Sequence, residues 1–500
     1  MTTWTRRGVL GVGIVGALSA CSSAPSAAPP EPTAAPSLTT SPTASSSSAA
    51  RVDWAQLRRH VQGTLARPGD PTYDTVRRLQ NPRYDDQRPL GVLSVATADD
   101  VATGVRFAQD HDLPVALRSG GHSYPGWSGG GRPRALVIDC RPLDDVRLDG
   151  TTATVGAGAS LAHVYGEVGR RGRAIAGGSC PTVGFSGLTL GGGVGVLTRA
   201  LGLTCDAVRS MRVVTADGTL RTASDDKEPD LFWALRGGGG GHLGVVTSFD
   251  VETSVAPTLS TIYLAWPFSA AREVIEAWQQ WAPGADDRLW STLKALGGES
   301  HRGEPTLLLS GTWTGPASAF EGRLAGLLDH VPAPTSRVPH TRGYLDAMRA
   351  FAGSGAREAF AATSHVMYAP LDAAGIGDLL DRVHLAQDSG LKEAGISIDA
   401  LGGRVRDLQP GDTAFVHREA LATVQYTATF PPGSARDADA YVHGFRDAML
   451  PHWGDHAYVN YADRTITDYR AAYFGDNADR LGRVRTTYDP EHFFTQPQGF

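Results

Sequence analysis

The chain has few thiols and very few lysines. Four cysteines in 500 residues are too sparse for the disulfide framework of a small secreted scaffold. The three lysines, Lys227, Lys294 and Lys392, all stand away from the glycine clusters, and no GxxxxGK[ST] segment occurs. A P-loop nucleotide site is therefore disfavoured, because that loop places its lysine on the phosphates.

The charge balance and the lack of long apolar runs exclude further classes. A net charge of −6 gives no general electrostatic reason to bind nucleic acid. Beyond Cys21 no run approaches the roughly 20 apolar residues of a transmembrane helix. At 500 residues, 41% of them hydrophobic and 20% charged, the chain is expected to form two or three globular domains, because one core rarely exceeds about 250–300 residues.

Residues 1–21 have the pattern of an export signal. Arg6 and Arg7 form a twin-arginine pair, an apolar run fills residues 8–20, and Cys21 follows directly. The sequence LSAC resembles a bacterial lipobox, in which the cysteine is lipidated; a plain signal peptide with an incidental cysteine is the alternative. We expect export by the twin-arginine route, with the Sec route left open. The protein would then be extracellular or attached to the outer face of the cytoplasmic membrane.

Residues 22–50 consist mainly of Ser, Ala, Pro and Thr with a single charge, a composition that cannot bury enough apolar surface to fold. We expect this segment to be a disordered tether. With Cys21 lipidated, it would let a folded body hang from a membrane surface.

Strand and helix patterns after residue 51 predict an α+β fold. Between about residues 87 and 255, short strands such as ALVIDC and GVVTSFDVE mix with capped helices. Between residues 256 and 455, longer strands such as STIYLAWPF and LATVQYTATF alternate with amphipathic helices. A broad sheet backed by helices is the simplest assembly there. The aromatic residues Trp290, Trp313 and Tyr368 of this region are expected to pack in a core.

Sixteen of the 60 glycines form three clusters, at residues 118–123, 177–195 and 236–246. In RSGGHS, the first of these, successive glycines after a strand let backbone N–H groups converge on an anion such as a pyrophosphate. Residues 177–195 are so rich in glycine that we expect neither helix nor strand there, and a backbone that passes close to a ligand. GAGASL at residues 156–161 lacks the third glycine of a Rossmann fingerprint, which disfavours that site as well.

Four ordered motifs resemble the berberine bridge enzyme-like flavin oxidases, which belong to the vanillyl-alcohol oxidase superfamily with a PCMH-type FAD domain. The motifs are RSGGHS, GGSCPTVGFSGLTLGGGVG, DLFWALRGGGGGHLGVVTSF and a C-terminal set, YVNYAD, YFGDNADRL and YDPEHFF. The resemblance covers nearly all of residues 80–500. It implies a PCMH-type FAD domain of two subdomains at residues 51–255, with its core at 87–255. An antiparallel sheet backed by helices would form the substrate domain at 256–455, and residues 456–500 would return to the FAD domain.

The resemblance implies that FAD is held by two covalent bonds, from His122 to the flavin 8α-methyl carbon and from Cys180 to C6. Taken alone, a turn histidine and a buried free cysteine would be the commoner interpretations. Two bonds would retain the flavin without enclosing it, which permits an open cleft. The resemblance also implies noncovalent cofactor contacts from Ser119, Gly120, Gly121, Ser123, Thr182, Val183, Gly184, Gly187, Gly192 and Val246.

Alcohol oxidation needs a group that takes the hydroxyl proton as hydride leaves the adjacent carbon. The resemblance places this base at Tyr461 and places Tyr458 and Asn460 on the cofactor. A phenol can act as the base only if its neighbours lower its pKa from about 10. Gln425 matches a substrate-facing position that is Glu in the berberine-type enzyme; because glutamine is a poor proton acceptor, Tyr461 is the expected base. Leu401 stands in the counterpart region of a second catalytic tyrosine, so none is expected.

The expected activity is oxidation of an alcohol, sugar or polycyclic hydroxyl, with O2 as electron acceptor and H2O2 as product. A dehydrogenase of the same fold with another acceptor stays open. A solute-binding lipoprotein would suit the anchor and tether but would leave His122 and Cys180 unexplained, and a catalytically idle flavoprotein is a weaker third hypothesis. No metal is expected. Cys140 and Cys205 are expected to be free buried thiols, because a twin-arginine substrate folds in the reducing cytoplasm.

Overall fold

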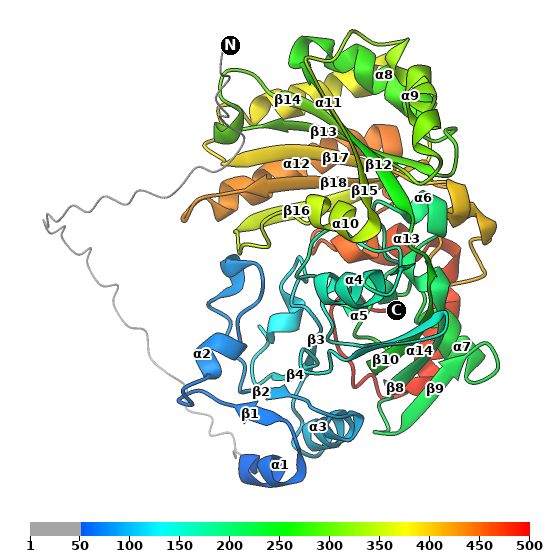
Figure 1. Cartoon of the computed structure of the whole chain (residues 1–500). Helices are drawn as coiled ribbons and strands as arrows, with labels where there is room; N and C mark the ends of the chain where they lie inside the picture. The colour runs from blue at the N-terminus through cyan, green and yellow to red at the C-terminus, as the bar shows by residue number, and fades with distance from the viewer. Residues whose placement is uncertain (1–51) are drawn as a thin grey trace, which may run out of the picture. The chain divides into compact units, whose positions relative to one another are not determined.

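A four-stranded sheet opens the part of the chain that the computed structural model describes, residues 52–500 (Figure 1). Its order is β1–β2–β4–β3, with the bounds Thr64–Ala66, Gly91–Ser94, Leu136–Asp139 and Val115–Arg118. β2, β4 and β3 are parallel, and helix α3 (Ala98–Asp110) connects β2 to β3. The Thr97 side chain caps α3 by accepting the Asp100 N–H. Because β3 ends at Arg118, the chain leaves this sheet directly into the loop of residues 119–123.

The second sheet is antiparallel and has the order β5–β6–β10–β8–β9, with the bounds Val146–Asp149, Thr152–Gly156, Val245–Glu252, Val208–Val214 and Leu220–Ser224. Buried and half-buried residues alternate along β10, as expected for a strand with one covered face. Short helices accompany this sheet: α4 (Leu161–Gly169), α5 (Phe185–Leu190), α6 (Thr198–Leu201) and α7 (Pro229–Ala234). A two-stranded sheet joins β7 (Arg173–Ala174) to β11 (Ser254–Val255).

The third sheet has seven antiparallel strands in the order β15–β12–β14–β13–β17–β18–β16. Their bounds are Ser336–Gly343, Thr258–Pro267, Thr306–Trp313, Leu289–Gly297, Glu393–Ala400, Ala422–Thr429 and Phe360–Met367. Helices α8 (Ala271–Trp281), α9 (Phe320–Leu328), α11 (Ala373–Leu385) and α12 (Ala435–Trp453) pack on one another and on one face of this sheet, over a hydrophobic core of their own. The opposite face carries polar residues, described below.

The C-terminal segment returns to the part of the molecule that holds the second sheet. Its helices are α13 (Tyr469–Phe474) and α14 (Ala478–Tyr488), and α14 packs against α7. Tyr473, Leu481 and Phe500 belong to the same hydrophobic core as residues of β8 and β10. Helix α10 (Tyr344–Phe351), which precedes β16, packs against α4. The two short helices near the start of the described chain are α1 (Trp54–His60) and α2 (Tyr73–Val76).

The predicted α+β class is confirmed, with an antiparallel sheet backed by helices after residue 256. Two features of the prediction were wrong. The stretch 177–195 contains helix α5, because five of the six residues from Phe185 to Leu190 are not glycine and the helix buries Phe185 and Leu190. Tyr368 does not pack in a core, since it is 38% exposed, whereas Trp290 and Trp313 are buried.

The remaining predictions concern the free thiols, the N-terminal segments, the domain boundaries and membrane-spanning helices. Cys140 and Cys205 are buried free thiols, as expected. The export signal at 1–21, Cys21 and the tether at 22–50 lie outside the described residues. Residues Val52–Phe500 form one compact unit, and the domain boundaries placed inside it stay predictions. Within residues 52–500, none of the helices is both long and apolar enough to cross a membrane.

Candidate active site

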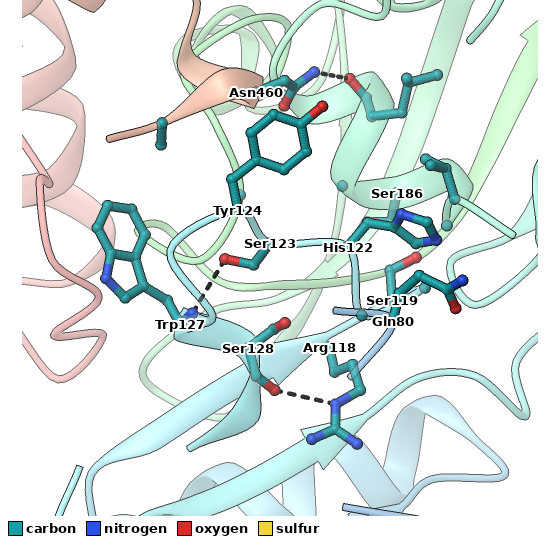
Figure 2. Close-up of a pocket in the computed structure, with 18 of the residues that line it drawn as sticks. Gln80, Arg118, Ser119, His122, Ser123, Tyr124, Trp127, Ser128, Ser186 and Asn460 are labelled. Atoms are coloured by element: carbon teal, nitrogen blue, oxygen red, sulfur yellow. Dashed lines mark hydrogen bonds between the residues drawn. The ribbon is translucent and has the colours of Figure 1, made fainter. Parts of the chain in front are cut away.

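A cavity of about 490 Å³ lies among the glycine-rich loops, within the usual size range of small-molecule sites. Its wall draws on segments far apart in the sequence, from Gln80 near the start of the described chain to Gln496 and Gln498 near its end. Figure 2 shows part of this wall. Most of the predicted site residues line it: Ser119, Gly120, Gly121, His122, Ser123, Cys180, Val183, Gly184, Gly187, Val246, Asn460 and Tyr461.

Two glycine loops cross at one end of the cavity with no room for side chains. A Cβ atom on Gly120 would lie 2.2 Å from the Gly184 nitrogen, and one on Gly184 would lie 2.0 Å from the Gly120 nitrogen. The Ser119 hydroxyl fixes the first loop by donating to the Ala157 carbonyl at 2.6 Å. Glycine at both positions therefore follows from the close approach of two backbones.

The loop of residues 119–123 presents free backbone donors. Among residues 52–500, none of its five backbone N–H groups donates to a protein acceptor. Successive unpaired N–H groups after a strand form a concave site for an anion. The arrangement fits the pyrophosphate of the expected FAD.

His122 and Cys180 both reach the cavity wall. His122 Nε2 lies 2.9 Å from the Thr182 hydroxyl oxygen, and burial lowers the pKa of His122 to about 4. The imidazole is therefore neutral at physiological pH and keeps a nitrogen lone pair. The Cys180 side chain is exposed toward the cavity, while the surrounding protein raises the pKa of its thiol. Thr182 itself does not line the cavity; it positions His122.

Two buried polar atoms on the wall have no partner in the described part of the chain. They are Ser128 Oγ and His242 Nδ1. Burial and the charge of Arg485 lower the pKa of His242 to about 3, so this ring is neutral as well. Buried polar groups are nearly always satisfied in folded proteins, so these atoms indicate that a polar ligand belongs here. Together with the free N–H groups and the two candidate nucleophiles, they fit FAD.

Tyr461 lines the cavity and stacks on a residue that the sequence did not single out. The rings of Tyr461 and Tyr124 lie 5.4 Å apart at 4° between their planes. Gln425 Nε2 donates to the Tyr124 hydroxyl, so Gln425 reaches the site through Tyr124 and not by lining the cavity. Tyr426, the next residue, is fully buried in the core on the other face of β18. The position of Tyr124, two residues after His122, was the available signal for its role.

Three predicted cofactor contacts differ in their placement. Asn460 lines the cavity and donates from Nδ2 to the Leu188 carbonyl at 2.9 Å and to the Tyr458 hydroxyl at 2.8 Å. Tyr458 lies behind Asn460 and also accepts the Gly193 N–H at 3.0 Å. Gly192 does not line the cavity either, because Phe415 fills the space beside it. Tyr458 and Gly192 thus support the wall from behind.

The protein environment raises the pKa of Tyr461, where the sequence argument required a lower value. Burial is the main cause, and Tyr124 and Asp399 add to it. Asp399, on β17, is a second residue that sequence reasoning missed. Burial raises the pKa of its carboxyl group, and the charge of Lys294 partly opposes this. The site therefore contains a protonated phenol and, within electrostatic reach of it, a carboxyl group with a raised pKa.

Comparison with known proteins places these features in context. The family described as "FAD binding domain" matches residues 89–224, and the one described as "Berberine and berberine like" matches residues 457–500. An "Uncharacterized FAD-linked oxidoreductase YgaK" of Bacillus subtilis is 32% identical over 447 residues, covering 87% of this chain and 96% of its own. A xylooligosaccharide oxidase of Thermothelomyces thermophilus is 30% identical over 444 residues, covering 82% of this chain and 86% of its own.

Solved structures of similar proteins have the same fold. The structure of BBE-like 1 from Physcomitrella patens superposes with a TM-score of 0.82 at 26% identity, over 89% of this chain and 98% of that one. The structure of a chitooligosaccharide oxidase superposes with a TM-score of 0.81 at 25% identity and the same coverage.

Proposed function

Because the chain belongs to the berberine bridge enzyme-like family of FAD-linked oxidoreductases, we propose that it oxidises an alcohol or sugar hydroxyl with an FAD bonded to His122 and Cys180. O2 then takes the electrons and gives H2O2. The observation that carries this proposal is that His122, Cys180 and Tyr461 line one cavity. The xylooligosaccharide oxidase among its relatives supports a sugar as substrate.

The residues around the cavity have separable tasks in this proposal. FAD, when bound, supplies the acceptor for the hydride that leaves the substrate carbon. The free N–H groups of residues 119–123 bind its pyrophosphate, and neutral His122 offers a nitrogen lone pair for the bond to the flavin. Cys180 provides the second attachment point from the opposite loop.

Proton removal is assigned to Tyr461 acting with Asp399. Burial, Tyr124 and the charge of Asp399 raise the pKa of Tyr461, so this residue is not ionised before the substrate binds. Its oxygen instead accepts the substrate proton while its own proton leaves for the Asp399 carboxylate, which burial makes a stronger acceptor than a free aspartate. Gln425 holds Tyr124 against Tyr461 and transfers no proton.

Export remains part of the proposal and concerns residues 1–50 alone. The twin-arginine pair at Arg6 and Arg7 directs a folded protein across the membrane, so FAD is loaded in the cytoplasm. Lipidation of Cys21 then anchors the protein, and residues 22–50 act as the tether.

The test begins with the colour of the purified full chain after acid precipitation. Wild type, His122→Ala and Cys180→Ala should each give a yellow pellet, since one bond suffices to retain the flavin, while the double variant should give a colourless one. A colourless wild-type pellet contradicts the covalent assignment.

Activity is then followed as bleaching of the flavin by sugars, oligosaccharides and polycyclic alcohols, with peroxide measured in air. Tyr461→Phe should abolish bleaching and keep the yellow colour, and Tyr368→Phe, at an exposed tyrosine, is the matched control. Bleaching without peroxide identifies another electron acceptor and hence a dehydrogenase. A flavin that no compound bleaches contradicts the proposed activity.

A further inference from the structure

The seven-stranded sheet has a polar face opposite the one that its helices cover. On β13, Leu293 and Ala295 point into the core under the helices, so the alternation of the strand points Lys294 the other way. The same alternation holds on β17 and β18. We call polar face the set of partly exposed residues on this side of the central strands: Tyr263, Lys294, Ser310, Ser397, Asp399 and Gln425.

The strand register places Lys294 in the same cross-strand row as Gln425, which contacts the tyrosine pair of the site. Lys294 is directly opposite Ser397 on β17, and Ser397 is directly opposite Gln425 on β18. Two strand spacings of about 4.8 Å put the Lys294 backbone roughly 10 Å from that of Gln425. Gln425 in turn donates to Tyr124, which stacks on Tyr461. Lys294 thus lies on the polar face two strands away from Gln425, which contacts the tyrosine pair.

Lys294 differs from the other two lysines in its surroundings. Lys227 and Lys392 are exposed, and Lys392 pairs with Glu358. Lys294 is partly buried, yet its ammonium group has no hydrogen bond or ion pair in the described chain. Its ammonium nitrogen is not among the buried unpaired polar atoms of the described chain, so it is accessible to solvent. Its three donors are therefore available to a ligand on the polar face.

Two carboxyl groups share this face of β17 with Ser397, and neither is within 4.0 Å of Lys294. Glu393 is engaged by His301, with Oε2 3.0 Å from Nε2. The charge of Asp399 raises the pKa of Tyr461 and of Tyr124, and burial raises the pKa of Asp399 itself. The positive charge of Lys294 acts to lower the pKa of both carboxyl groups, but neither group accepts a hydrogen bond from its ammonium group in the described chain.

We infer that Lys294 binds a carboxylate of the substrate, so that the preferred substrates are acidic oligosaccharides with the carboxylate about one ring away from the carbon that is oxidised. This inference rests on the proposed function. An ammonium group forms a charge-assisted hydrogen bond with a carboxylate, which is stronger than its bond to a sugar hydroxyl. The competing explanation is that Lys294 only balances the charges of Asp399 and Glu393.

The experiment compares di- and trisaccharides of glucuronate, galacturonate and mannuronate with their methyl esters, which keep every ring and hydroxyl but lose the charge. Flavin bleaching gives kcat/KM for wild type, Lys294→Gln, Lys294→Met and the conservative Lys294→Arg. Lys227→Gln, at an exposed lysine far from the sheet in sequence, is the matched control. Thermal unfolding and flavin absorbance of each variant show whether it has folded and carries FAD.

The expected result is a preference of about 10- to 100-fold for at least one acid over its ester in wild type. Lys294→Gln and Lys294→Met should lose the preference, while Lys294→Arg and Lys227→Gln should keep it. If wild type oxidises neutral sugars or the esters as well as the acids, the inference is overturned and the proposed function stands. Equal losses for acid and ester in Lys294→Gln also overturn it, because charge balance alone predicts them. If yellow wild-type protein is bleached by no saccharide, the proposed function fails and the inference with it.

Discussion

The ring of Tyr124 lies parallel to that of Tyr461, with 5.4 Å between their centroids and 4° between their planes. Tyr124 belongs to the loop that carries His122, whereas Tyr461 belongs to the C-terminal segment. The stack therefore couples the cofactor loop to the proposed catalytic group. The hydrogen bond from Gln425 fixes Tyr124 on its other side.

Replacing Tyr124 by Phe should keep the stack and remove the hydrogen bond from Gln425. A hydrogen bond of this kind contributes about 0.5–1.5 kcal/mol, so we expect kcat to fall about 3- to 10-fold with unchanged flavin content. For Tyr124→Leu, which also removes the stacked ring, kcat should fall further. Stopped-flow bleaching measures both; equal rates for Tyr124→Phe and Tyr124→Leu would show that the stack has no part in positioning Tyr461.

Asp399→Asn should slow bleaching about 100-fold, the scale of a lost proton acceptor. Activity of wild type should fall with decreasing pH as Asp399 becomes protonated, with a midpoint above 3.8 because burial raises its pKa. The variant should lose this acid limb. Exposed Asp388→Asn is the control, and an acid limb that survives in Asp399→Asn would be evidence against the assignment.

The same substitution should stabilise the protein at neutral pH. Since the pKa of Asp399 is raised on folding, the folded chain binds this proton more tightly than the unfolded chain. The free energy of unfolding therefore falls as pH rises above 3.8 through the raised pKa, and asparagine removes that loss. The melting temperature of Asp399→Asn should exceed that of wild type at pH 7 by more than at pH 4. A difference that does not change with pH would contradict this.

Gly184→Ala and Gly187→Ala should fail for different reasons. A methyl group at Gly184 collides with the Gly120 backbone, so we expect little folded protein. A methyl group at Gly187 meets nothing within 4 Å in the protein and lies in helix α5, where alanine is favoured by about 0.5–1 kcal/mol. Because Gly187 lines the cavity, Gly187→Ala should fold well but carry less FAD. Flavin-to-protein absorbance ratios and thermal unfolding separate the two; full flavin content in Gly187→Ala would place the cofactor away from α5.

Asp206→Ala should destabilise the fold by about 3–5 kcal/mol, because it leaves the guanidinium group of Arg418 buried without its ion pair. Arg418 is fully buried and donates to both carboxylate oxygens of Asp206 at 2.7 and 2.8 Å. Asp145→Ala removes the exposed pair with Arg147, whose side chains are both 80% exposed, and should cost no more than about 1 kcal/mol. Denaturant unfolding compares them. Similar costs for the two variants would mean that Asp206 and Arg418 contribute little as a pair.

Local patterns were enough to predict the parts of the fold with regular periodicity. The strands STIYLAWPF and LATVQYTATF are in place, because alternation is a property of adjacent residues. β15 escaped prediction, since all but one of its residues are exposed and it contains Pro339, so it lacks alternation. Within residues 52–500 it is an edge strand, with β12 as its one neighbour.

Residues of the site could be predicted where they belong to a motif within one segment of the chain. The motif RSGGHS predicted the loop of residues 119–123, and twelve of the predicted residues line the cavity. Asp399 was missed because its place in the sheet depends on the register of β17 with distant strands, which no local pattern reveals. The pKa of Tyr461 was misjudged for the same reason, as burial and the neighbours that set it come from distant segments.

The cavity wall reaches from Gln80 to Gln498, so it is complete only when almost the whole described chain is present. A nascent chain that has emerged as far as the first sheet already contains the loop with His122 but lacks Tyr461, Gln496 and Gln498. The complete wall therefore forms only after the C-terminal segment has packed against the glycine-rich loops, so FAD meets its full set of contacts late in folding.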